Sequence, residues 1–124
     1  MANELILIVE DNEKNLKLVR DVLQYRGYQT IEAGSGEEGV RLAKARIPDL
    51  VLMDIQLPGM DGYEATRQIR ATPELAKVPI IAVTSYALSG DEAKTRAAGC
   101  DGYVAKPFSP RQLLAKIREF LPEQ

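Results

Sequence analysis

Short apolar runs alternate with longer segments of mixed polarity along this chain. Four of the runs contain no charged residue, and they cover residues 5–9, 50–53, 80–83 and 102–105. Because polar residues do not alternate with the apolar ones, these runs are typical of strands that are buried on both faces. The segments between the runs place apolar residues at helical spacing. The pattern therefore predicts strands and helices in alternation.

Start and stop signals set the bounds of the predicted helices. A capping residue stands three positions before a Glu or Gln at Ser35, Asp61, Ser89 and Ser109. Gly or Pro follows four of the helical segments, at Gly27, Pro48, Pro73 and Gly99. The predicted strands are 4–9, 28–33, 50–53, 80–84 and 102–105, and the predicted helices are 12–26, 36–46, 61–71, 89–98 and 109–121.

This order of elements predicts the α/β class, with a doubly wound parallel sheet of five strands and helices on both faces. The last helix carries an apolar stripe that should dock on the sheet, formed by Leu113, Leu114, Ile117, Phe120 and Leu121. Helix 89–98 offers mainly Ala93, Ala97 and Ala98. Because alanine side chains bury little area, we expect this helix to be held weakly.

Composition narrows the class of protein. The 124 residues suit one domain, and a net charge of −2 without a Lys/Arg cluster argues against nucleic-acid binding. No apolar stretch approaches the roughly 20 residues that a membrane span needs. Residues 1–4 lack the basic segment of a signal peptide, and the lone Cys100 excludes an internal disulfide. We therefore expect a single cytoplasmic domain over residues 1–124, without an output domain and without a membrane or nucleic-acid partner.

Polar residues stand where the apolar runs end. Glu10 and Asp11 follow the first run, and Asp54, Thr84 and Lys106 follow the others. If the runs are parallel strands, their carboxyl ends share one edge of the sheet, where ligands of such sheets bind. Three carboxylates suit a hard cation such as Mg²⁺, which often shares its site with a phosphate. A carboxylate such as Asp54 can also act as a nucleophile toward phosphorus.

Four sequence pieces extend this interpretation. They are residues 8–12 (Ile-Val-Glu-Asp-Asn), residues 52–58 (Leu-Met-Asp-Ile-Gln-Leu-Pro) with Asp61-Gly62, residues 83–85 (Val-Thr-Ser) and residues 105–108 (Ala-Lys-Pro-Phe). In this order and spacing they resemble the receiver domains of bacterial two-component response regulators, over essentially the whole chain. The resemblance implies the flavodoxin-like (βα)5 fold with strand order 2-1-3-4-5.

The resemblance also implies roles for the polar residues. Asp54 would accept a phosphoryl group from a phosphohistidine on a histidine kinase or a histidine phosphotransfer protein. Glu10, Asp11, Asp54 and the backbone carbonyl of Gln56 would hold Mg²⁺. Lys106 and Thr84 would contact the phosphoryl oxygens, and Thr84 with Tyr103 would form the switch.

The predicted function follows from these roles. Phosphorylation would change the face formed by residues 89–121 and so control contacts with a downstream protein. The chain would then be a binding module, a monomer or weak dimer, and not an enzyme, although it would assist its own phosphorylation and slow dephosphorylation. Gln56 and Tyr86 occupy positions that flank the phosphoryl group in the family.

Several alternatives remain open on the sequence. Asn12, Asn15, residues 53–58 and residues 99–100 resemble single-domain regulators of the DivK cell-cycle type, although receivers of hybrid histidine kinases contain similar strings. An aspartate-nucleophile phosphatase would need a general acid where Gln56 stands. An FMN carrier of the same architecture would not place Glu10 and Asp11 beside the phosphate. Leu18 lies off the main apolar stripe of its helix, and is either a core residue or a contact for a partner.

Overall fold

The computed structural model describes residues 3–85 and 91–122, which form a three-layer α/β structure. Its strands are β1 (Leu5–Val9), β2 (Gln29–Ala33), β3 (Leu50–Asp54), β4 (Ile80–Thr84) and β5 (Gly102–Ala105). Its helices are α1 (Glu13–Tyr25), α2 (Gly36–Arg46), α3 (Gly62–Arg70), α4 (Asp91–Ala98) and α5 (Pro110–Phe120), with a 3-10 turn η1 (Pro73–Leu75) before β4. The predicted elements are all present, with small shifts at their ends.

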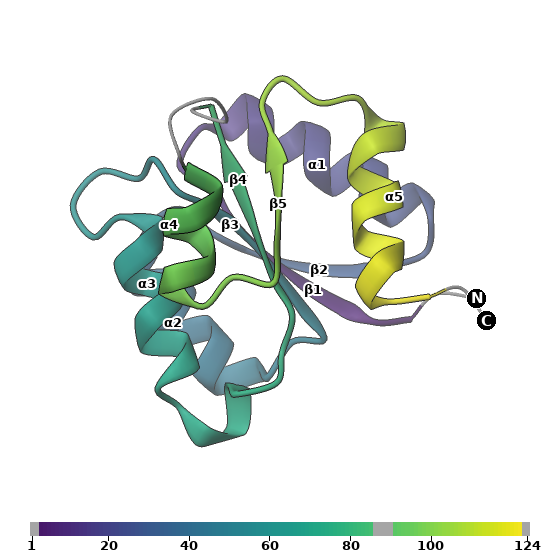
Figure 1. The fold of residues 1–124 in the computed structure, drawn as a ribbon. Helices are drawn as coiled ribbons and strands as arrows, with labels where there is room; N and C mark the ends of the chain where they lie inside the picture. The colour runs from purple at the N-terminus through teal and green to yellow at the C-terminus, as the bar shows by residue number, and fades with distance from the viewer. Residues whose placement is uncertain (1–2, 86–90, 123–124) are drawn as a thin grey trace.

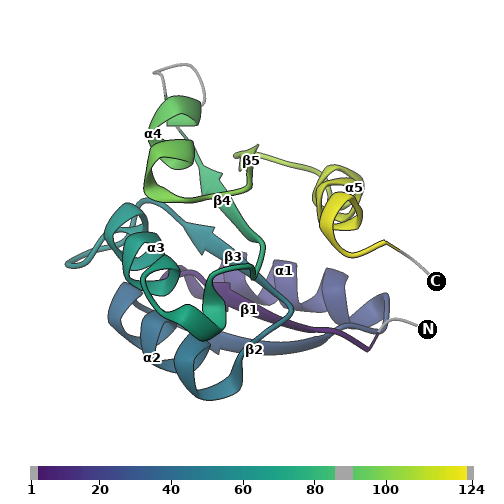
Figure 2. The same ribbon diagram turned by 60° about the horizontal axis from the view of Figure 1, so that its bottom comes forward.

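The strands form one parallel sheet in the order β2-β1-β3-β4-β5, which confirms the predicted fold. Helices α1 and α5 cover one face, and α2, α3 and α4 cover the other (Figures 1 and 2). The register aligns Asp54 with Val83, and Thr84 with Ala105. The polar residues at the ends of the central strands therefore meet at one edge of the sheet.

The core explains why the apolar runs do not alternate. Ile6 and Ile8 of β1 pack on the side of α1 and α5, whereas Leu7 and Val9 pack on the side of α2 and α3. Both faces of the central strands are thus buried. The predicted apolar stripe of the last helix packs on the same side of the sheet as Ile6 and Ile8, where α5 contributes buried and half-buried side chains to the core.

Helix α4 is attached by few side chains. Among its described side chains, only Thr95 and Ala98 are buried. Ala93 and Ala97 are exposed, and Thr95 lies on the inner face of the helix. The sparse burial agrees with the expectation of a weakly held helix.

Capping residues begin the helices as predicted. Ser35, Asp61 and Ser109 each accept a hydrogen bond from the backbone N–H three residues later, whereas Ser89 lies outside the described residues. Gly62 lies directly after the cap Asp61, and it allows the start of α3 to pack closely against the end of β3. A Cβ atom there would lie 2.3 Å from the backbone oxygen of Asp54, so the absence of a side chain lets α3 start directly beside that strand end.

Candidate functional site

The structure brings the predicted site residues together at the carboxyl edge of the sheet. Asp54 is the last residue of β3 and Thr84 is the last residue of β4. Glu10 follows β1 and Lys106 follows β5. Each side chain is thus positioned by the end of a strand of the sheet.

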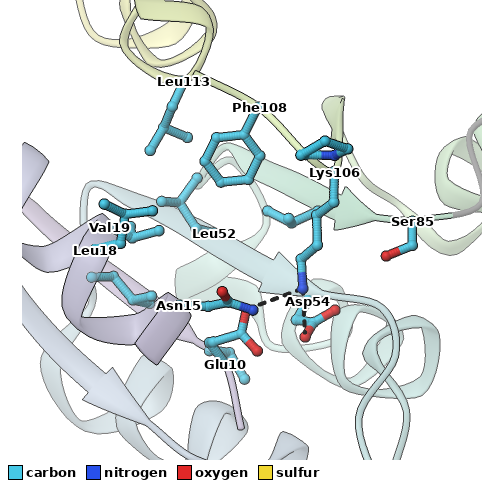
Figure 3. Close-up of a pocket in the computed structure, with 14 residues that line it drawn as sticks. Glu10, Asn15, Leu18, Val19, Leu52, Asp54, Ser85, Lys106, Phe108 and Leu113 are labelled. Atoms are coloured by element: carbon cyan, nitrogen blue, oxygen red, sulfur yellow. Dashed lines mark hydrogen bonds and ion pairs between the residues drawn. The ribbon is translucent and has the colours of Figure 1, made fainter. Parts of the chain in front are cut away.

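Lys106 joins two carboxylates at the centre of this edge. Its Nζ lies 3.2 Å from Oε1 of Glu10 and 3.4 Å from Oδ2 of Asp54 (Figure 3). The Lys106 side chain is 21% exposed and that of Asp54 only 3%. Burial disfavours the ammonium charge, but the attraction of Asp54 and Glu10 outweighs it, so the pKa of Lys106 is raised. The lysine therefore stays charged and partly offsets the two acids.

The pKa of Glu10 reflects the concentration of negative charge at this edge of the sheet. Burial of its carboxyl, together with a hydrogen bond to Asp54 and the charge of Asp54, raises its pKa from 4.5 to about 7. A hydrogen bond from the backbone N–H of Asn12 and the charge of Lys106 act in the opposite direction. The site thus holds more carboxylate than one ammonium can neutralise.

The surplus of acid fits a divalent cation. Glu10, Asp11 and Asp54 each offer an oxygen, and these oxygens all lie within 4.8 Å of one another. Mg²⁺ takes oxygen ligands, commonly one or two carboxylates together with water and phosphate. The donor set therefore fits the predicted metal, and the carbonyl of Gln56 stays a predicted further ligand.

The residue two positions after Asp54 links two loops of the site. The backbone N–H of Gln56 donates to Oδ1 of Asp54 over 3.0 Å. The side-chain oxygen of Gln56 accepts from the backbone N–H of Ser85 over 3.3 Å. No role was predicted for Ser85, because the partner of a backbone N–H cannot be inferred from residue type. Tyr86, the other predicted flanking residue, lies outside the described residues.

Thr84 and Tyr103 lie on the same face of the sheet. Tyr103 is half-buried against the core layer that contains Ala82, which is also its register partner. Side chains two apart on a strand share a face, so Thr84 points to the side of Ala82, which is the side of α3 and α4. Thr84 itself is fully buried. The predicted switch pair thus lies on the side of the sheet that α3 and α4 cover.

An apolar cavity of about 450 Å³ opens beside the charged group. Asp54, Glu10 and Lys106 line one part of it, while Leu18 and Phe108 line another (Figure 3). Leu18 is 53% exposed, so the possibility that it is a core residue is wrong. It lies on α1 with its side chain at the rim of this cavity.

The raised pKa of Glu10 leads to a prediction about metal binding. Mg²⁺ needs the ionised carboxylate, so protons should compete with it below pH 7. We expect the affinity for Mg²⁺ to be about tenfold weaker at pH 6 than at pH 8, as titration calorimetry at both values would measure. The Glu10→Gln variant should bind Mg²⁺ more weakly at pH 8 and lose most of this pH dependence. Equal affinity of the wild type at the two pH values would contradict the prediction.

Comparisons with known proteins agree with the geometry. The family model for the response regulator receiver domain matches residues 6–118. The polar-differentiation response regulator DivK of Brucella ovis is 46% identical over 116 residues, which are 94% of this chain and 94% of that protein. The predicted likeness to DivK-type regulators is confirmed by this identity.

Solved structures show the same fold. The receiver domain of a Pseudomonas aeruginosa sensor histidine kinase, crystallised with a magnesium ion coordinated in its active-site cleft, superposes with a TM-score of 0.91 and 39% identity, over 98% of this chain and 99% of that one. The chemotaxis response regulator CheY4 of Vibrio cholerae has a TM-score of 0.91 and 26% identity, over 95% and 98% of the two chains. Within residues 3–85 and 91–122, no helix has the length and apolar character that a bilayer crossing requires.

Proposed function

This chain belongs to the family of response regulator receiver domains, and we propose that it accepts a phosphoryl group on Asp54 from a phosphohistidine of a partner protein. The observation that supports this most strongly is a carboxylate only 3% exposed, with the ammonium of Lys106 3.4 Å away. The ammonium of Lys106 compensates the charge of the Asp54 carboxylate and holds it in position to attack a phosphorus atom. The direct test is phosphate uptake from a small phosphodonor by the wild type and by Asp54→Asn.

The proposed transfer is a single displacement at phosphorus. A carboxylate oxygen of Asp54 forms the new bond to phosphorus as the bond from phosphorus to the histidine nitrogen breaks, and the histidine leaves with that electron pair. Lys106 offsets charge on a phosphoryl oxygen, and the hydroxyl of Thr84 donates to another. Mg²⁺, which Glu10, Asp11, Asp54 and the Gln56 carbonyl would hold, supplies Lewis-acid neutralisation of the phosphoryl charge when bound.

We further propose that the chain works as a binding module and not as a phosphatase. A phosphatase with an aspartate nucleophile would use a carboxylic acid at the position of Gln56 to protonate its leaving group. The amide there has no such proton to give, and its oxygen is engaged with the N–H of Ser85. These features favour retention of the phosphoryl group over rapid turnover.

The signal would leave through the face formed by the described residues 91–121. Attraction of Thr84 to the phosphoryl group, followed by an inward turn of Tyr103, would shift α4. Charge-assisted hydrogen bonds contribute about 1.5–3 kcal/mol each, so a few of them suffice for a shift in population. Because most of the described side chains of α4 are exposed, we expect this helix to move at a lower free-energy cost than the others.

Partners and location are part of the same proposal. We propose a cytoplasmic regulator, a monomer or weak dimer, that takes its phosphoryl group from a histidine kinase or histidine phosphotransfer protein, and membership of the response regulator family and the likeness to DivK support such a donor. The likeness to the receiver of a sensor histidine kinase supports the alternative of a receiver detached from a hybrid kinase. A phosphotransfer profile against the host's kinases and phosphotransfer proteins would distinguish the two.

Asp54 and the exposed Leu18 line the same cavity, and we propose that a phosphohistidine approaches Asp54 past Leu18. We expect Leu18→Lys to slow transfer from a phosphorylated kinase or phosphotransfer protein about tenfold, because a charge there opposes close apolar contact. Phosphorylation by a small phosphodonor should stay within about twofold of the wild-type rate, since small donors need no docking surface. Rates from radiolabelled donors would measure both.

Tyr25→Lys is the matched control for this experiment. Tyr25 is the last residue of the same helix and is 90% exposed, but it does not line the cavity. Its substitution should leave both rates unchanged. If Leu18→Lys transferred as fast as the wild type from every cognate donor, the donor would dock elsewhere.

A further inference from the structure

The cavity beside Asp54 is larger than a phosphoryl group needs. It measures about 450 Å³, which lies within the range of about 300–1,000 Å³ that is usual for ligand pockets. Glu10, Asp54 and Lys106 line the charged part of it (Figure 3). A phosphoryl group held by these residues fills only a small share of the volume. The rest of the cavity plays no part in binding the phosphoryl oxygens.

The walls of this remaining space are apolar and come from the sheet, from α1 and from the segment that follows β5. Leu18 of α1 lies at the rim and is 53% exposed, and Phe108 is half-buried. Such walls offer no partner to a charged group, but they favour an apolar one. Buried apolar side chains complete them, among them Ile8, Val19, Leu52 and Leu113.

The carboxylate of Asp54 opens into the same cavity. Its side chain is only 3% exposed, and it lines the cavity together with Lys106 and Ser85. Oδ1 accepts from the backbone N–H of Gln56 at 3.0 Å, and Oδ2 lies 3.4 Å from Nζ of Lys106. In a displacement at phosphorus, the leaving group lies on the opposite side of the phosphorus atom from the attacking oxygen. The leaving group of a donor therefore extends away from this carboxylate.

We propose that the apolar part of the cavity holds the leaving group of a small phosphodonor, so that acyl phosphates of apolar acids phosphorylate Asp54 faster than acetyl phosphate does. The inference rests on the proposed function, since it names the class of small donor that the same aspartate uses. Leu18 and Phe108 are specificity residues in this reaction, because they contact the leaving group and not the reacting atoms.

The transfer from an acyl phosphate balances without a proton donor. A carboxylate oxygen of Asp54 forms the bond to phosphorus as the bond from phosphorus to the acyl oxygen breaks, and the electron pair leaves on the carboxylate of the acid. The attacking group and the leaving group are both carboxylates, so no general acid is needed. The apolar remainder of the leaving group contributes contacts that persist in the transition state, and such contacts raise kcat/KM.

The first experiment compares benzoyl phosphate with acetyl phosphate on the wild type in the presence of Mg²⁺. One methylene group in an apolar pocket changes kcat/KM by roughly 10- to 200-fold. We expect kcat/KM for benzoyl phosphate to be at least about tenfold higher, after each value is divided by the rate at which that donor hydrolyses in buffer. The para-carboxybenzoyl phosphate has the same ring but would place a charge among the apolar walls, so it should lose this advantage. Equal values for benzoyl and acetyl phosphate would overturn the inference.

Variants of the apolar walls test where the ring lies. Phe108→Ala should lower the ratio of kcat/KM for benzoyl phosphate to that for acetyl phosphate about fivefold. Phe120→Ala is the matched control, because Phe120 is also a half-buried aromatic residue but does not line the cavity. Leu18→Ala is a second variant, at an exposed position where folding is not at stake, and should lower the ratio about twofold. A loss of stability affects both donors alike, so an unchanged ratio in both variants would contradict the inference.

Inert phosphonates separate the cavity from the chemistry. Benzylphosphonate has a ring joined to phosphorus through carbon, which is not transferred, and methylphosphonate has the same anionic group without the ring. With Mg²⁺ present, benzylphosphonate should bind about tenfold more tightly, and it alone should shift the amide resonances of Leu18 and Phe108. Such binding without any modification of Asp54 by acetyl phosphate would count against the proposed function, although the preference of the cavity for an apolar group would stand. Modification by acetyl phosphate together with equal affinity for the two phosphonates would overturn the inference and leave the proposed function intact.

Discussion

Asp54→Asn is expected to abolish phosphate uptake from a small-molecule phosphodonor, whereas the wild type takes up one phosphate in the presence of Mg²⁺. Asparagine has the same shape as aspartate, so the sheet edge and its contacts should be kept. Its amide oxygen is a poor nucleophile, and the acyl phosphate cannot form on it. The expected effect is therefore complete loss of the modification without loss of the fold, as intact-protein mass spectrometry and circular dichroism would measure.

Asp61→Asn provides the control for this result. Asp61 lies at the same edge of the protein, where its side chain caps α3 by accepting from the N–H of Glu64 at 2.9 Å. Asparagine caps helices about as well as aspartate, so this variant should be phosphorylated like the wild type. Labelling of Asp54→Asn at the wild-type level would show that another carboxylate accepts the phosphoryl group. Glu10 would be the first candidate to examine, because it lies beside the same lysine.

The fold could be predicted because local signals agreed with one another. Unalternating runs such as residues 5–9 allow only strands buried on both faces, and a capping residue such as Ser109 marks where the next helix starts. Pro48 marked the end of α2 correctly, but the left-handed conformation of Ile47, with a φ of +44°, was not predicted, because no glycine stands at that position.

The site could be predicted in its members but not in its energetics. Residue type and position at strand ends placed Asp54 and Lys106 together, because parallel strands bring their carboxyl ends to one edge. The raised pKa of Glu10 depends on burial and on its distance to Asp54, which only the folded chain determines. The hydrogen bonds from the Arg70 guanidinium to the carbonyls of Gly99, Leu75 and Val78 were not predicted for a similar reason, since backbone carbonyls carry no sequence signal.

Lys106→Met is expected to keep the fold in the presence of Mg²⁺ but to lose the response to a phosphoryl group. Methionine fills a similar volume without the charge, so the loss of the ammonium near Asp54 and Glu10 is the main change. One charge-assisted hydrogen bond of about 1.5–3 kcal/mol corresponds to a loss of roughly 10- to 150-fold in affinity for beryllium fluoride. Fluorine NMR titration would measure this affinity. Amide shifts at Thr84 and in α4 should be correspondingly weak.

Lys116→Met separates this effect from the general loss of a lysine, because Lys116 lies on α5 and pairs with Glu119 at 3.2 Å, away from the acidic edge.

A second measurement on Lys106→Met uses the sign of the pKa shift of Glu10. Removal of the ammonium should raise that pKa further, so in the absence of Mg²⁺ the folded state takes up a proton that the unfolded state, with its pKa near 4.5, does not. The free energy of unfolding should then fall as the pH rises from about 5 to about 8, more steeply than in the wild type, and Mg²⁺ should restore part of it. A Lys106→Met protein whose stability is independent of pH, and whose affinity for beryllium fluoride equals that of the wild type, would show that Lys106 neither compensates the carboxylates nor holds the phosphoryl group.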